Sequence, residues 1–216
     1  MAGVLLSYEI LKIMLSGDAR AGLDRYRAAV THRFGVSMLK IVLTFGLIAG
    51  AIVSAMMLLT LPFMDRIGFE KGEVIGYTTM VLAFLMVYFG VRSYRDNVAG
   101  GDLSFGRALK VALLITAVGS TCYVATWQLV YYKLAPDFGE KSMAYELEKE
   151  RKAGASEAEL AEKKAELDEF QAMYRNPLVN IAITFLEPLP VGLVLSLVTA
   201  GVLSRRRRTE PAAAAA

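Results

Sequence analysis

The sequence predicts an all-α fold: an integral membrane four-helix bundle with an extracytoplasmic helical hairpin. Three observations support this prediction. Of the 216 residues, 55% are hydrophobic and 21% are charged, whereas soluble globular chains average about 25% charged residues. Four long stretches of the chain are almost free of charge. The basic residues gather in the segments that are predicted to lie on one side of these stretches.

The four stretches are long and apolar enough to cross a membrane as helices. They are Ile41–Met64, Val74–Val91, Val111–Tyr132 and Asn176–Ser204, which hold 24, 18, 22 and 29 residues, and only Glu187 interrupts them with a charge. A transmembrane helix needs about 20 mostly apolar residues, with a range of roughly 17–25. In hydrocarbon, each backbone polar group must find its partner within the segment, which a helix provides.

The basic residues predict the orientation of the chain. The segments before the first span, between the second and third spans, and after the fourth hold 14 Lys and Arg against six Asp and Glu. Residues 133–175 hold eight basic and eleven acidic residues. Because Lys and Arg accumulate in cytoplasmic loops, both termini are predicted to be cytoplasmic. The net charge of +3 then reflects topology, so the lipid bilayer is the expected partner and nucleic acid is not.

The segment 1–37 is interpreted as a cytoplasmic N-terminal extension. Apolar positions between Val4 and Leu15 have the spacing of a short amphipathic helix at the membrane surface. The alternative, which we favour, is an artefact of the chosen start site. Met38 and Lys40 stand directly before an apolar run, as at a natural start.

The rest of the chain divides into four parts. Residues 38–132 hold the first three spans and their loops, and residues 176–208 hold the fourth span with its basic anchor Arg205–Arg208. Residues 209–216 are predicted to be a disordered tail. Residues 133–175 are predicted to form the extracytoplasmic hairpin, with Gly154 between its two helices.

Local spacing marks the helix ends of this hairpin. Asp137 with Glu140, and Ser156 with Glu159, have the spacing of a capping box. Asn176 and Pro177 follow the second helix and are predicted to end it.

Small residues recur at every fourth position on the first and last spans. Gly46, Gly50 and Ser54 form one such face, and Gly192, Ser196 and Ala200 form the other. These faces let helix backbones approach closely. We favour packing within the bundle over homodimerisation, because four helices offer internal partners for every small face.

Glu187, the only acid within the predicted spans, belongs to a predicted polar site. Glu187 shares a helix face with Asn180 and Thr184, and Pro188 and Pro190 follow it. Prolines remove backbone donors and disfavour helix at the preceding residue, so the helix is expected to break here. We therefore predict an intramembrane polar site made of these five residues. A polar stripe on the third span is expected to face it, namely Thr116, Ser120, Tyr123 and Trp127.

Two interpretations of Glu187 remain. In the first, which we favour, the helix before it lies shallow, Pro188–Ser204 crosses the membrane, and Glu187 caps a helix near the interface. In the second, Leu178–Leu203 is one broken span, and a carboxylate near its centre marks a polar pathway. Carbonyls freed beside an acid in a broken helix resemble the ion sites of secondary transporters.

Five stretches carry a resemblance to a known family: LTFGLIAG (43–50), GFEKGEVIGY (68–77), FGVRSYRDN (89–97), SFGRAL (104–109) and FLEPLPVGL (185–193). From about residue 38 to 208 the chain resembles a bacterial multi-pass membrane family known as domain of unknown function 4199. The resemblance covers the four spans in order and leaves out 1–37. It implies a location in the bacterial inner membrane and carries over no activity.

Function is predicted mainly from what the sequence lacks. We find no nucleophile elbow, zinc-protease motif, phosphate-binding loop or dinucleotide fingerprint, and one His and one Cys leave few metal ligands. We therefore expect no enzyme activity, no cofactor and no metal. The favoured function is a non-enzymatic envelope interaction or accessory protein that acts with other membrane proteins or with itself. The alternative is a small proton-coupled transporter or channel-like assembly that uses Glu187.

Overall fold

The computed structural model describes residues 19–204, and within them the side chains of residues 38–204. The chain divides between Ile41 and Val42 into two compact units. The predictions for the apolar stripe of residues 4–15, for the basic anchor and for the tail lie outside the described residues.

Every regular element of the described residues is helical. In chain order they are α2 (Ala19–Thr60), the 3₁₀ turn η1 (Leu61–Phe63), α3 (Met64–Ile67), α4 (Phe69–Asn97), α5 (Phe105–Leu129), the π-helical turn η2 (Val130–Leu134), α6 (Phe138–Lys152), α7 (Glu157–Tyr174), α8 (Pro177–Leu186) and α9 (Leu189–Leu203). Four segments are long and apolar enough to cross a membrane: Met38–Ile67, Phe69–Asn97, Phe105–Leu134 and Pro177–Leu203. The predicted all-α membrane fold is confirmed.

The helices extend beyond the uncharged stretches of the sequence. The second span begins at Phe69 and not at the predicted Val74, which brings Glu73 into the helix. An uncharged stretch marks the part of a helix that suits hydrocarbon, whereas the helix itself continues into the polar interface, where charges are solvated.

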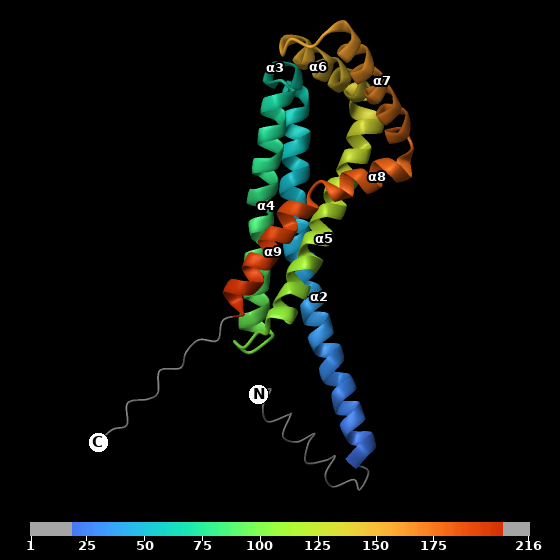
Figure 1. The fold of residues 1–216 in the computed structure, drawn as a ribbon. Helices are drawn as coiled ribbons and strands as arrows, with labels where there is room; N and C mark the ends of the chain where they lie inside the picture. The colour runs from blue at the N-terminus through green and yellow to red at the C-terminus, as the bar shows by residue number, and fades with distance from the viewer. Residues whose placement is uncertain (1–18, 205–216) are drawn as a thin grey trace, which may run out of the picture. The chain divides into compact units, whose positions relative to one another are not determined.

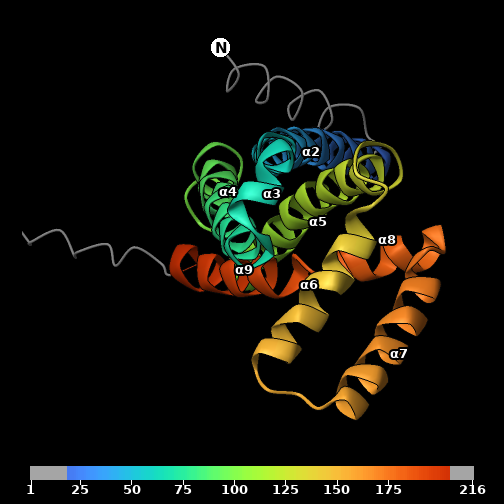
Figure 2. The same cartoon turned by 90° about the horizontal axis from the view of Figure 1, so that it is seen from above.

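Within the unit that starts at Val42, α5 is the central helix of the bundle. It packs against α4, α8 and α9, and Figure 2 shows α2, α4, α5 and α9 grouped around a common axis. The helices α6 and α7 form the predicted hairpin at one end of this bundle (Figure 1). We call this the hairpin end, and we call the opposite end, where Gly100 and Gly101 turn the chain from α4 to α5, the loop end.

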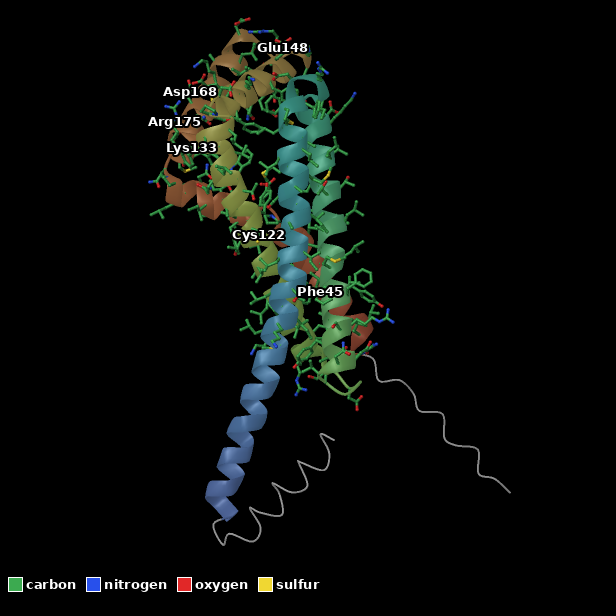
Figure 3. All side chains as sticks on the ribbon, turned by 180° about the vertical axis from the view of Figure 1, so that it is seen from behind. Phe45, Cys122, Lys133, Glu148, Asp168 and Arg175 are labelled. Atoms are coloured by element: carbon green, nitrogen blue, oxygen red, sulfur yellow. The ribbon has the colours of Figure 1, made fainter. Side chains whose placement is uncertain are left out.

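Small residues of α2 bring it against α5 in a constant register. A Cβ added to Gly46 would lie 2.6 Å from the Cβ of Val118, and one added to Gly50 would collide with Cys122. One turn later, the hydroxyls of Ser54 and Thr126 form a hydrogen bond of 2.7 Å. The two helices therefore run parallel. Figure 3 labels Cys122 on α5.

The faces of α4 and α9 also depend on glycine. Added Cβ atoms would collide with Ile115 at Gly90 and with Thr116 at Gly192, and both partners belong to α5. The hydroxyls of Thr116 and Ser196 lie 3.2 Å apart and are hydrogen-bonded. The small faces predicted on the first and last spans, in α2 and α9, therefore pack against α5 inside the bundle.

The hairpin confirms one predicted cap and corrects another. Glu159 accepts a hydrogen bond of 2.7 Å from the backbone N–H of Ser156, and the Ser156 hydroxyl accepts from the N–H of Glu159, so this capping box is present. The predicted box at Asp137 and Glu140 is wrong. Asp137 makes no side-chain cap and instead pairs with Lys141 at 3.1 Å, because a cation one turn later competes for the carboxylate.

Gly154 separates α6 from α7 as predicted, with a φ of +95° that favours glycine. Charged residues of both signs occur on the hairpin, and Figure 3 labels Lys133, Glu148, Asp168 and Arg175 at the hairpin end.

Candidate functional site

The fourth span is broken at Glu187. The helix α8 ends at Leu186, and α9 begins at Leu189. In Figures 1 and 2, α8 runs across the bundle, whereas α9 is inclined along it. The break follows from the sequence, because Pro188 and Pro190 cannot donate backbone hydrogen bonds.

The length of α9 limits how deep Glu187 lies in a bilayer. The helix has 15 residues, and at a rise of about 1.5 Å per residue it is roughly 22 Å long. The hydrocarbon layer is about 30 Å thick. If the charged residues that follow Leu203 lie at one interface, Glu187 falls inside the hydrocarbon layer, because an inclined helix of this length crosses less than the full thickness.

A hydrogen-bonded polar network surrounds the break. The hydroxyl of Tyr123 donates to Oε2 of Glu187 over 2.7 Å. Asn180 is fully buried, and its Oδ1 accepts a bond of 2.7 Å from Gln128 and one of 3.3 Å from Thr184. Buried polar groups in apolar surroundings are costly without partners, and these bonds explain why α8 is tied to α5.

The polar stripe of α5 meets this network only in part. The indole N–H of Trp127 donates to the hydroxyl of Tyr174 over 2.9 Å, and that hydroxyl lies 3.0 Å from Oγ1 of Thr184. Ser120 is fully buried, and its hydroxyl has no hydrogen-bond partner among the described residues. Thr116 bonds to Ser196 of α9 and does not reach α8.

Beside Glu187, the hairpin end contains a partly open cavity of about 350 Å³. We call it the hairpin-end cavity. Its wall comes from α2, α4, α5 and α6, and from the break itself. Three carboxylates line it, namely Glu73 of α4, Glu146 of α6 and Glu187. Among the residues that the structure describes, no Lys or Arg belongs to its lining.

Aromatic rings form one side of this cavity. The ring centroids of Phe69 and Tyr145 lie 5.3 Å apart, those of Phe69 and Phe138 lie 5.4 Å apart, and those of Phe138 and Trp127 lie 5.0 Å apart. All four rings line the cavity. Such distances are typical of favourable aromatic pairs. They also fasten α6 to the ends of α4 and α5, so the first helix of the hairpin closes the cavity.

The acidic lining corrects one inference from the sequence. We expected no second acid within the spans, but Glu73 lies in α4 and faces the same cavity as Glu187. The misplaced start of the second span hid this residue. A helical signal was present, because Glu73, Tyr77 and Met80 are spaced for one helix face and all three line the cavity. The sequence holds no local signal for Glu146, because it lies among many charged residues of the hairpin.

The described residues contain no group of three or more His, Cys, Asp or Glu placed to hold a metal ion. The three cavity carboxylates therefore do not form a metal centre in this conformation. They make a negative, aromatic-walled space next to a broken helix.

The comparisons with known proteins agree with the resemblance found in the sequence. No curated protein and no solved structure matches the chain. One family model, described as "Protein of unknown function (DUF4199)", matches residues 44–205, which cover most of the first span, the other three spans and the hairpin. The match extends over well more than half of the 216 residues, so the chain belongs to this family of unknown function.

Proposed function

We propose that the protein is a small proton-coupled transporter in which Glu187 gains and loses the proton. The observation that carries this proposal is the meeting of a broken span, an acid and a cavity at one point. Ionisable residues within the membrane are costly and usually mark a pathway for ions or substrates. Transporters use interrupted helices to build such sites, because the break frees backbone groups.

The groups around Glu187 suit a change of charge. Tyr123 of α5 donates to its carboxylate, and Glu73 and Tyr77 of α4 and Tyr174 of α7 interact with it electrostatically. When Glu187 loses its proton, the cavity gains a negative charge beside Glu73. A cationic substrate is favoured in that state and released when the proton returns, which is the basis of exchange.

The proposed location is the bacterial inner membrane, with both termini in the cytoplasm and the hairpin outside. The excess of basic residues near the loop end supports this orientation. In this orientation the cavity lies near the outer surface, where a proton supplied from outside reaches Glu187 over a short path.

A pH jump on a solid-supported membrane tests the proposal without a known substrate. Proton binding at a site inside the bilayer displaces charge, so the wild-type protein is expected to give a transient current. Glu187→Gln removes the titrating group and should abolish the current. Glu162→Gln, on the exposed surface of α7, is the matched control and should keep it. A current that survives in Glu187→Gln, or none in the wild type, contradicts the proposal.

The second candidate is the non-enzymatic envelope interaction or accessory protein. The specific observation in its favour is that α7 exposes Phe170 and Met173, which are 45% and 47% accessible. Exposed apolar residues on a surface helix suit contact with another membrane protein or with a second copy. Crosslinking in native membranes tests this candidate. Crosslinks from the α7 face are expected, and recovery of the free monomer alone counts against it.

A further inference from the structure

We propose that the ligand of the hairpin-end cavity is an organic cation with an apolar body, such as a quaternary ammonium compound. This inference names the substrate class of the proposed transporter and rests on that function. It is carried by three features of the cavity: its charge, its aromatic wall and its remaining apolar lining.

The charge of the cavity favours a cation. Within the described part of the chain, three of its lining residues carry carboxylates and none is Lys or Arg. Among the described residues, Glu146 pairs with Lys149 at 4.0 Å and also interacts electrostatically with Lys163 of α7. Glu73 and Glu187 have no ion pair within the described part of the chain; Glu187 has the Tyr123 hydroxyl instead. Lys141, which lies on the same helix as Glu146, is held outside by Asp65 and Asp137 at 3.3 and 3.1 Å.

The aromatic wall favours an organic cation over a metal ion. Tyr145, Phe69, Phe138 and Trp127 contact one another in sequence, and all four line the cavity. Aromatic rings attract cations, and binding sites for quaternary ammonium groups are commonly built from such rings. Hard metal ions instead require several oxygen ligands in a compact shell, and no such group occurs among the described residues.

The remaining lining suits an apolar body. Met56, Met57, Met64 and Met80 line the cavity on the side of α2 and α4. Thioether side chains adapt to irregular partners and are frequent at surfaces that bind varied ligands. The volume of about 350 Å³ falls within the usual range of roughly 300–1,000 Å³ for small-molecule sites.

The single tryptophan of the chain is a reporter inside the site. Trp127 lines the cavity, and the sequence has one Trp. The full-length protein in lipid nanodiscs is titrated with benzyltrimethylammonium at constant ionic strength, and Trp127 emission is recorded. A saturable change is expected. Phenylacetate and benzyl alcohol have similar apolar bodies but a negative or no charge, and neither should give a saturable change.

Four variants sharpen the test. Glu187→Gln and Glu73→Gln should each weaken the apparent affinity at least tenfold, whereas Glu162→Gln should leave it unchanged. Phe138→Leu removes one ring of the wall and should also weaken binding. A gel-filtration profile like that of the wild type identifies the variants that fold. If Glu187→Gln does not fold, the affinity of Glu73→Gln tests the role of the carboxylates.

The outcomes separate the ligand class from the transport function. Saturable binding of benzyl alcohol equal to that of the cation, or no saturable change with the cation, overturns the inference. If the cation fails to bind while the pH jump gives its current, the ligand class is wrong and proton coupling stands. If the cation binds and the current is absent, the ligand class stands and the proposed transport is wrong.

Discussion

The two ends of the bundle are built differently from the same helices. At the loop end, Val87, Val91, Val111 and Ile115 are fully buried, and the helices meet through glycines. At the hairpin end, α5 diverges from α2 and α4 (Figures 1 and 2), and a cavity of about 350 Å³ opens. Small side chains permit close packing in a membrane, whereas the aromatic and Met side chains of the hairpin end hold the helices apart. The close packing at the loop end fixes the positions of the helices whose other ends line the cavity.

The largest expected difference between the two ends concerns buried volume. Ile115→Ala at the loop end should lower the free energy of unfolding by about 2–5 kcal/mol, because a cavity forms where none existed. Met57→Ala should cost clearly less, since Met57 already borders the open cavity. Thermal unfolding in the same lipid nanodiscs measures both. Equal losses would mean that the two ends are packed alike.

The glycines should respond with opposite signs. Gly46→Ala should destabilise the protein by about 1–3 kcal/mol through overpacking, because its Cβ would meet Val118 and the backbone carbonyl of Ile115. Gly76 of α4 has no atom within 4 Å of an added Cβ. Gly76→Ala should therefore be neutral or stabilising, by up to about 1 kcal/mol from helix propensity. If both substitutions changed the free energy of unfolding in the same direction, the difference in packing between the two ends would be contradicted.

The network at the break should contribute modestly to stability. Tyr123→Phe removes the 2.7 Å bond to Glu187. Interhelical hydrogen bonds in membranes average about 0.6 kcal/mol and reach about 1.7 kcal/mol, so the loss in unfolding free energy should fall in this range. If the pH-jump current also changes, the hydroxyl acts on the proton site as well as on stability. A loss of several kcal/mol would mean that the break is a structural core and not an adaptable site.

The smallest effect is expected at the tip of the hairpin and depends on pH. Hydrogen bonds from the backbone N–H and hydroxyl of Ser156 lower the pKa of Glu159 below its ordinary value. The capping box therefore stabilises the start of α7 at neutral pH, and this contribution is lost as the pH falls through the lowered pKa. The protection factors of the amides in the first turn of α7, which compare the observed exchange rate with the intrinsic rate at the same pH, should therefore fall in acid. Glu159→Gln should remove this pH dependence, whereas Glu157→Gln should keep it.

Much of the fold could be predicted because hydrocarbon imposes strong constraints on sequence. Charge-free length located all four spans, and Ser156, Gly154 and Pro177 marked ends of the hairpin helices. Such signals depend only on residues that are close together in the chain. The break at Glu187 could be predicted for the same reason, because prolines act on the backbone next to them.

The cavity could not be predicted because it depends on distant parts of the chain. Glu73, Glu146 and Glu187 come from three different helical segments, and only the divergence of α5 and the docking of α6 bring them to one space. Charged residues near the end of a span are ordinary interfacial residues when read from sequence alone. Docking of α6 depends on ring contacts between Phe138, Phe69 and Trp127, whose positions in sequence are unrelated.

Exchange of protons for an organic cation through Glu187 can be measured directly as a change in internal pH. Proteoliposomes that contain a pH-sensitive dye receive benzyltrimethylammonium outside; this cation is permanently charged and carries no proton itself. We expect alkalinisation inside with the wild type and with Glu162→Gln, because protons leave as the cation enters, and no change with Glu187→Gln. Unchanged internal pH with the wild type, or an equal rise with Glu187→Gln, would contradict this exchange.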